Sequence, residues 1–145
     1  MSEKIKSFRD LVIWQKGIAF VEEIYQVTKA FPRDEQFGLI VQMRRAAVSV
    51  PCNIAEGFRR KHFKEYRQFL SIALGSLGEI ETQLDVARRL GYIAPACYNE
   101  LLFKNEEICK MTQALLKKIN IAANSKLISQ NSKLETHDSQ LKTDN

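Results

Sequence analysis

Turn-forming residues are scarce in this sequence of 145 residues, which holds six glycines and three prolines. That supply is too small for an all-β protein, whose strands need frequent turns. No uninterrupted apolar run approaches the roughly 18 residues of a membrane span. The charged stretch MSEKIKSFRD also lacks the apolar segment of a signal peptide. We therefore expect a cytoplasmic protein that makes no use of a membrane.

Cysteine and histidine are few as well. Cys52, Cys97 and Cys109 form an odd set without CxxC spacing, which indicates thiols in a reducing compartment. The two histidines, His62 and His137, belong to no HExxH or ExxH motif, and no phosphate-binding loop or dinucleotide fingerprint occurs. The sequence therefore predicts no enzyme, no cofactor and no metal site.

Positive charge is concentrated in one window. The formal net charge is +5, and residues 44–67 hold seven basic residues against Glu56 and Glu65, so this window carries all of it. Such a cluster is typical of a surface that binds a phosphate-bearing partner, but charge alone slightly favours a solvated helix surface. The candidate nucleic-acid-binding residues are Arg44, Arg45, Arg59, Arg60, Lys61, Lys64 and Arg67.

Apolar residues recur at three- and four-residue intervals in four segments, which predicts four helices near residues 11–31, 34–58, 62–90 and 95–121. Short connections between them predict an all-α, antiparallel up-down-up-down four-helix bundle over residues 10–121. Residues 1–9 are expected to form a short N-terminal arm, and the polar residues 122–145 a disordered C-terminal tail. The first helix has two apolar seams, which indicates a second subunit as one of its partners.

Pro51 interrupts the second of these segments without interrupting its pattern. The apolar seam from Ile40 to Phe58 keeps its spacing through Pro51, which predicts a kinked helix rather than a helix end. Gly57 is expected to loosen or end this helix before the basic run.

Polar residues lie at helical spacing beside the apolar seams. Such stripes can satisfy each other by hydrogen bonds, or they can hold a ligand or ion between Glu56 and Glu79 as paired carboxylates. We favour the structural network. On the second helix the stripe comprises Gln42, Ala46, Ser49, Asn53 and Glu56, and on the third Ser76, Glu79 and Gln83.

The sequence resembles the 23S ribosomal RNA intervening-sequence proteins over about residues 8–120. The resemblance rests on FRDLVIWQK, AFPRDEQFGL, IVQMRRAAVSVPCNIAEGFRR and FLSIALGSLGEIETQL, and SVPCNIAEG is its most specific part. It implies an antiparallel four-helix bundle that assembles as a homopentamer, without catalytic activity or cofactor. It also implies a relation to the nucleic-acid-binding accessory proteins of diversity-generating retroelements. Pro51, Asn53, Glu56 and Gly57 match the family motif, for which we expect a structural role.

Three functional hypotheses follow, in order of preference. The first is a non-enzymatic homo-oligomer that binds RNA or DNA phosphates as an accessory factor. The second is a protein-interaction scaffold whose basic residues pair with acidic groups. The third is a bundle that holds a small ligand or ion in its polar stripe.

Overall fold

The computed structural model describes residues 4–143, and every regular element in that range is a helix. Two are short 3-10 turns and four are α-helices. In chain order they are η1 (Phe8–Asp10), α1 (Val12–Thr28), η2 (Arg33–Glu35), α2 (Leu39–Arg59), α3 (Phe63–Arg89) and α4 (Pro95–Thr143). No helix within these residues is long and apolar enough to cross a membrane.

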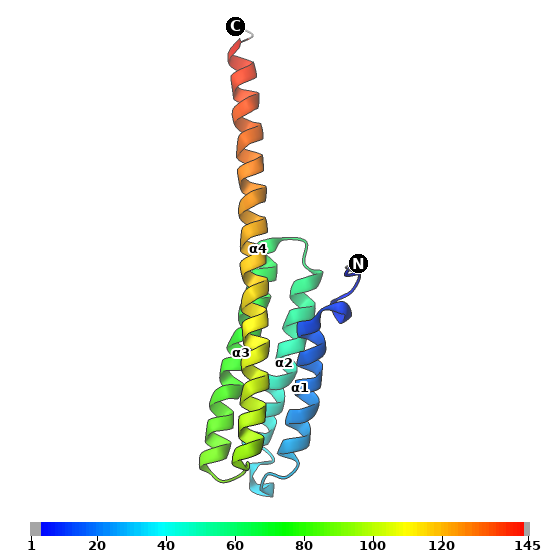
Figure 1. The fold of residues 1–145 in the computed structure, drawn as a ribbon, viewed down its shortest axis with the longest axis vertical. Coiled ribbons are helices and arrows are strands. Elements are labelled where there is room, and N and C mark those ends of the chain that lie inside the picture. The colour runs from blue at the N-terminus through cyan, green and yellow to red at the C-terminus, as the bar shows by residue number, and fades with distance from the viewer. Residues whose placement is uncertain (1–3, 144–145) are drawn as a thin grey trace.

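The four α-helices lie side by side, and each packs against two others: α1 on α2, α2 on α3, α3 on α4, and α4 on α1. The α1–α2 and α3–α4 connections lie together at the lower end of Figure 1, and the α2–α3 connection lies at the upper end. At the lower end the rings of Phe31 and Tyr92 are in contact, with centroids 5.4 Å apart. The structure is thus a helical bundle with its connections at alternate ends.

The apolar seams predicted from the sequence supply the core. On α1 only the seam of Ile13, Phe20 and Ile24 is buried. The other seam of α1 is partly exposed, with Trp14 half-buried and Tyr25 40% exposed. The core residues of the other helices include Met43, Val50, Ile54, Leu70, Leu77, Ile80, Leu84, Leu101 and Ile108.

The second helix begins later than its sequence suggests. We expect a start near Asp34, whereas the structure places Asp34 and Glu35 in η2 and begins α2 at Leu39. Glu35 Oε2 accepts a hydrogen bond of 2.8 Å from the Leu39 amide, so the acidic cap lies before the helix rather than in its first turn. The predicted continuity through Pro51 is confirmed, since α2 includes that proline.

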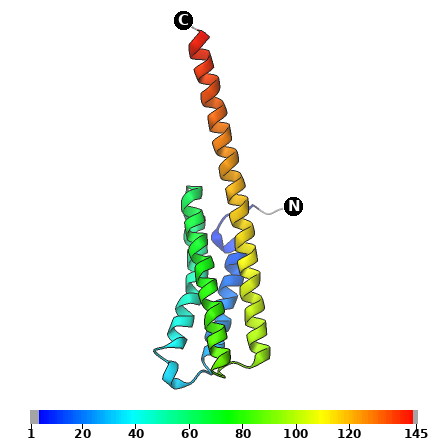
Figure 2. The same ribbon diagram turned by 90° about the vertical axis from the view of Figure 1, so that its left-hand side faces the viewer.

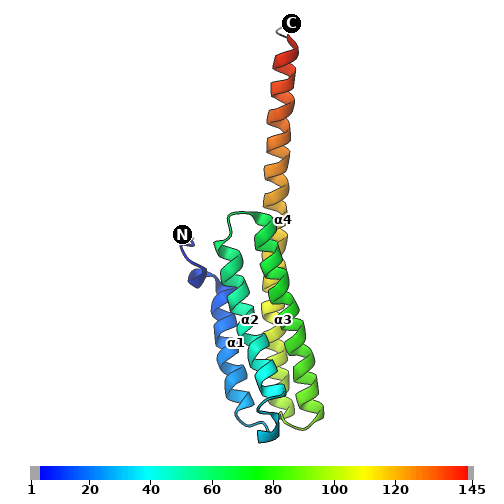
Figure 3. The same cartoon turned by 180° about the vertical axis from the view of Figure 1, so that it is seen from behind.

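The projecting segment, residues 122–143, differs from the disordered tail expected of it, because α4 continues as one helix to Thr143. Figures 2 and 3 show this segment leaving the bundle at the end where α2 and α3 are connected. Its sequence contains neither glycine nor proline, so nothing in the backbone chemistry breaks the helix. At 1.5 Å per residue it extends about 33 Å.

Two glycines with opposite surroundings allow a test of the α2–α3 packing. A Cβ atom on Gly57 would lie 2.9 Å from Tyr66 Cδ1 and 3.0 Å from Phe69 Cβ, whereas one on Gly75 would meet nothing within 4 Å. We expect Gly57→Ala to lower the free energy of unfolding by about 1–3 kcal/mol through overpacking. Gly75→Ala should raise it by about 0.5–1 kcal/mol through helix propensity. Urea unfolding of both variants tests this, and equal effects would contradict the close approach at Gly57.

Candidate nucleic-acid interface

The polar stripe predicted on α2 and α3 meets at Ser49. Asn53 Nδ2 donates to the Ser49 carbonyl at 2.7 Å and to Ser49 Oγ at 2.9 Å. Ser76 Oγ donates to Ser49 Oγ at 2.8 Å, which joins the two helices. Asn53 and Ser76 therefore share a partner rather than bonding each other, and the bond between the two serines holds α2 and α3 in register.

The two carboxylates of the stripe have separate partners. Glu56 accepts from Arg60 one turn later, at 3.2 Å, and Glu79 accepts from Gln83 Nε2 at 3.3 Å. The structure thus gives no support to the idea that Glu56 and Glu79 form a ligand or ion site together. Across residues 4–143 no group of three or more histidine, cysteine or acidic side chains is arranged to hold a metal ion.

A small hollow of about 140 Å³ lies elsewhere, between α1 and α4. Its charged residues pair with each other: Lys16 with Glu107 at 2.5 Å, and Lys104 with Glu23. Hydrogen bonding to Glu23 is the main cause that raises the pKa of Lys104. These pairs tie the two helices together at the surface, where such bridges contribute about 0–1 kcal/mol each.

The thiols differ in exposure. Cys52 is exposed on α2, whereas Cys97 and Cys109 are partly buried on α4. Desolvation raises the pKa of both Cys97 and Cys109, with neighbouring carboxylates adding to the effect. A raised pKa leaves less thiolate near neutral pH, so these two thiols are poor nucleophiles.

The structure separates the predicted basic residues into two groups. Arg44 and Arg45 lie in the first third of α2, about 21 Å along the helix from Arg59. Arg44 is occupied within the chain: its Nε donates to Thr28 Oγ1 at 2.9 Å, and its guanidinium lies 4.5 Å from the Tyr25 ring centroid. These two arginines therefore do not share a surface with the rest of the cluster.

The remaining five predicted residues lie where α2 ends and α3 begins. Arg59 and Arg60 each lie against a ring, Arg59 over Phe8 at 5.0 Å and Arg60 over Phe69 at 4.9 Å. Arg67 donates to Asn120 Oδ1 on α4 at 3.0 Å. The other two, Lys61 and Lys64, are exposed.

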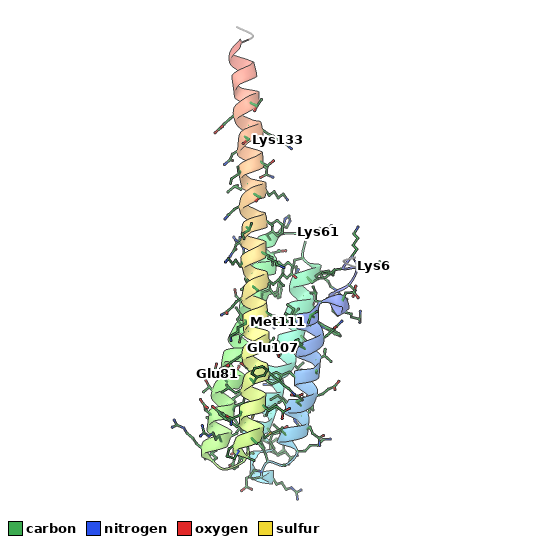
Figure 4. All side chains as sticks on the ribbon, in the orientation of Figure 1. Lys6, Lys61, Glu81, Glu107, Met111 and Lys133 are labelled. Atoms are coloured by element: carbon green, nitrogen blue, oxygen red, sulfur yellow. The ribbon has the colours of Figure 1, made fainter. Side chains whose placement is uncertain are left out.

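The N-terminal arm adds basic residues to this surface that sequence reasoning missed. Phe8 is buried, only 9% exposed, and Arg9 lies over the same ring that Arg59 contacts, 4.6 Å from its centroid. Figure 4 shows Lys6 of the arm and Lys61 at the same end of the bundle. We call this surface the basic end; it comprises Lys4, Lys6, Arg9, Arg59, Arg60, Lys61, Lys64 and Arg67.

A local capping motif holds the arm in place. Ser7 Oγ accepts from the Arg9 amide at 3.2 Å, and Asp10 Oδ2 accepts from the Lys6 and Ser7 amides at 2.9 and 3.1 Å. Asp10 closes η1 rather than capping the first α-helix, and α1 has no side-chain cap. The SxxD spacing of this capping box was the sequence signal that an ordered turn precedes the helix.

Fold and surface together define a small helical-bundle protein with one basic end. The chain matches the family model of the 23S rRNA-intervening sequence protein over residues 9–114. It belongs to that family, as its sequence resemblance predicts.

A solved structure shares the fold over most of this chain. It is the crystal structure of a protein of unknown function from the S23 ribosomal protein family of Bacteroides thetaiotaomicron. The two chains are 25% identical with a TM-score of 0.67, over 73% of this chain and 99% of that one. No curated protein matches the sequence.

The serine bridge between α2 and α3 can be tested by a double-mutant cycle. We expect Ser49→Ala and Ser76→Ala to show a coupling energy of about 0.5–1.5 kcal/mol, because each removes the same hydrogen bond. Ser49→Ala should cost more than Ser76→Ala, since it also removes a partner of Asn53. Ser71→Ala, on the exposed side of α3, is the control and should change stability by less than about 0.5 kcal/mol. Additive single-mutant effects in urea unfolding would show that the bridge does not stabilise the bundle.

Proposed function

We propose that this protein is a non-enzymatic, cytoplasmic homo-oligomer that binds RNA or DNA phosphates through its basic end, as an accessory factor. The observation that carries this proposal is the placement of Arg9 and Arg59 on one ring, that of Phe8. Residues 50 positions apart in the sequence are thereby gathered into one positively charged surface. The fold we propose is the antiparallel up-down-up-down bundle with α2 bent at Pro51.

Bringing like charges together is unfavourable unless something offsets their repulsion. Among the described residues, the acidic groups near the basic end are Asp10, Glu56 and Glu65, against eight basic ones. Asp10 is used in capping backbone amides, and Glu56 is paired with Arg60. A bound polyanion would neutralise the excess positive charge that remains.

The stacked arginines are suited to bind phosphate. A guanidinium that lies on an aromatic face keeps its N–H groups directed outward at its edge, and the ring fixes its orientation. Arg59 over Phe8 and Arg60 over Phe69 both have this arrangement. Less of their side-chain freedom is then lost when a phosphate binds.

The same contacts argue for phosphate rather than base recognition. Phe8 is buried, Phe63 and Tyr66 are partly buried against the core, and Phe69 is partly buried. Burial is the cause that raises the pKa of Tyr66. Base stacking needs an open ring face, so these rings favour binding that depends on salt and discriminates little between sequences.

Self-association would place several copies of the basic end in one assembly. The second seam of α1 is partly exposed, and α3 carries Ile72 and Val86 on its outer side at 51% and 41% exposure. These residues support a homo-oligomer, and the family resemblance implies a pentamer. Copies arranged in a ring would multiply the basic ends into one surface of high positive charge.

A charge reversal at each end of the bundle tests phosphate binding. We expect Arg59→Glu/Arg60→Glu/Lys61→Glu to weaken binding of fluorescent RNA and DNA more than tenfold. It should also reduce the slope of log K against log salt by about three. The matched control is Lys29→Glu/Arg33→Glu/Arg89→Glu, which makes the same change in net charge at exposed positions near the opposite end.

Equal loss in both triple variants would show that only net charge matters, and it would contradict a localised interface. If the wild-type protein binds neither nucleic acid, the scaffold hypothesis replaces this one, and an acidic protein partner becomes the expected ligand. Light scattering on the same samples reports the mass of the binding species.

A further inference from the structure

The projecting segment consists of a seven-residue sequence repeat. Residues 124–130 read NSKLISQ, residues 131–137 read NSKLETH, and residues 138–144 read DSQLKTD. Each copy has asparagine or aspartate first, serine second, lysine or glutamine third and leucine fourth. A strict seven-residue period corresponds to 3.5 residues per turn, the period of a left-handed coiled coil. A helix that only faces solvent has no reason to keep it.

The structure leaves the first two leucines of this repeat uncovered. Leu127 and Leu134 are 58% and 64% exposed, and every residue from Asn124 to Thr136 is exposed. A polar helical extension gains little stability from helix propensity alone, because tertiary packing supplies most helix stability in proteins. A continuous α4 therefore implies a partner along the projecting segment.

The apolar stripe of the segment continues the face by which α4 packs in the bundle. Ile119 is buried at 6% exposure, Ala123 is half-buried, and Leu127 is exposed. These residues are four apart and so lie along one side of the helix. Within the bundle, the other helices cover that side of α4. Along the projecting segment, the same side is exposed.

We infer that the projecting segments of two or more copies of this chain wind together as a parallel coiled coil. In it Leu127 and Leu134 occupy the d positions, and Asn124 and Asn131 the a positions. The inference shares with the proposed function only the premise that the chain binds copies of itself, and it requires no nucleic acid.

The repeat is suited to pair with itself, and in one direction. In a parallel arrangement each asparagine meets its equivalent and can hydrogen bond to it, while each leucine meets leucine. An antiparallel arrangement would place asparagines against leucines and bury amides without partners. Lys126 and Lys133 fall at the c positions, away from the seam, so like charges do not meet across it. The family match ends at residue 114, so the repeat belongs to the part of this chain outside the matched region.

Two pairs of variants in the full-length protein test the coiled coil. Leu127→Asp/Leu134→Asp places two charges in the seam, and Ser125→Asp/Ser132→Asp places the same two charges, seven residues apart, at b positions on its outside. All four residues are exposed, so neither variant disturbs the bundle. The readout is amide hydrogen exchange of residues 124–136, with mass from light scattering.

We expect these amides to be protected at least tenfold in the wild type. The protection should persist in the serine variant and be lost in the leucine variant. Because both variants carry two aspartates, a difference between them reports the seam rather than helix propensity. Unprotected amides in the wild type, or equal loss in both variants, would overturn the inference.

A third variant gives an effect of the opposite sign. Replacing the polar a residue in Asn131→Leu should raise the protection, because a buried polar residue at a lowers stability in exchange for a defined register. Unchanged or lower protection in this variant would contradict the assignment of Asn131 to the seam. Nucleic-acid binding is measured separately on the charge-reversal variants, so failure of either proposal is recognised independently of the other.

Discussion

The packing of α2 against α3 depends on residues of little bulk at two levels of the helix, Ser49 and Gly57. On the other side of α2, Gly17 of α1 lies against Pro51, where an added Cβ would be in ordinary van der Waals contact at 3.5 Å. Ser49 bonds Ser76 of α3 at 2.8 Å, and Gly57 admits Tyr66 and Phe69. These contacts fix the position of α2 along the bundle, and through it the place where the helix delivers Arg59 and Arg60. The position of the basic end therefore follows from the packing of small residues.

Much of this fold could be predicted from the sequence because helix packing leaves a regular trace. The 3-4 spacing of apolar residues located all four helices, and the seam through Pro51 indicated that α2 would continue. The start of α2 could not be predicted from Asp34, because that residue lies within the 3-10 turn η2, and the side chain that bonds the first amide of α2 is that of Glu35. Buried polar residues were missed as well. Asn105 is fully buried and donates to the Leu77 carbonyl at 3.0 Å. From sequence alone, a single asparagine in a helical segment is expected to lie at the surface.

The two ends of the chain show where reasoning from composition fails. Lys4, Lys6 and Arg9 precede the apolar pattern, so their sequence resembles a free arm, and only the burial of Phe8 brings them to the basic end. Residues 122–143 are polar enough to be read as disordered. Whether such a segment is helical depends on a partner along it, and composition does not report the partner. The seven-residue period does indicate a partner helix, because it depends on the spacing of the leucines along the helix and not on overall composition.

The projecting segment and the basic end, marked by Lys6 and Lys61, lie at the same end of the bundle (Figure 4), which couples the two proposals. A parallel coiled coil would gather the basic ends of all copies around one axis, where their repulsion opposes assembly. A polyanion bound across those ends would remove that repulsion. By thermodynamic linkage it would strengthen self-association as much as self-association strengthens its binding. Salt, in contrast, would screen the repulsion and also displace the phosphates. Assembly without nucleic acid should therefore tighten as salt rises, while assembly on nucleic acid should loosen.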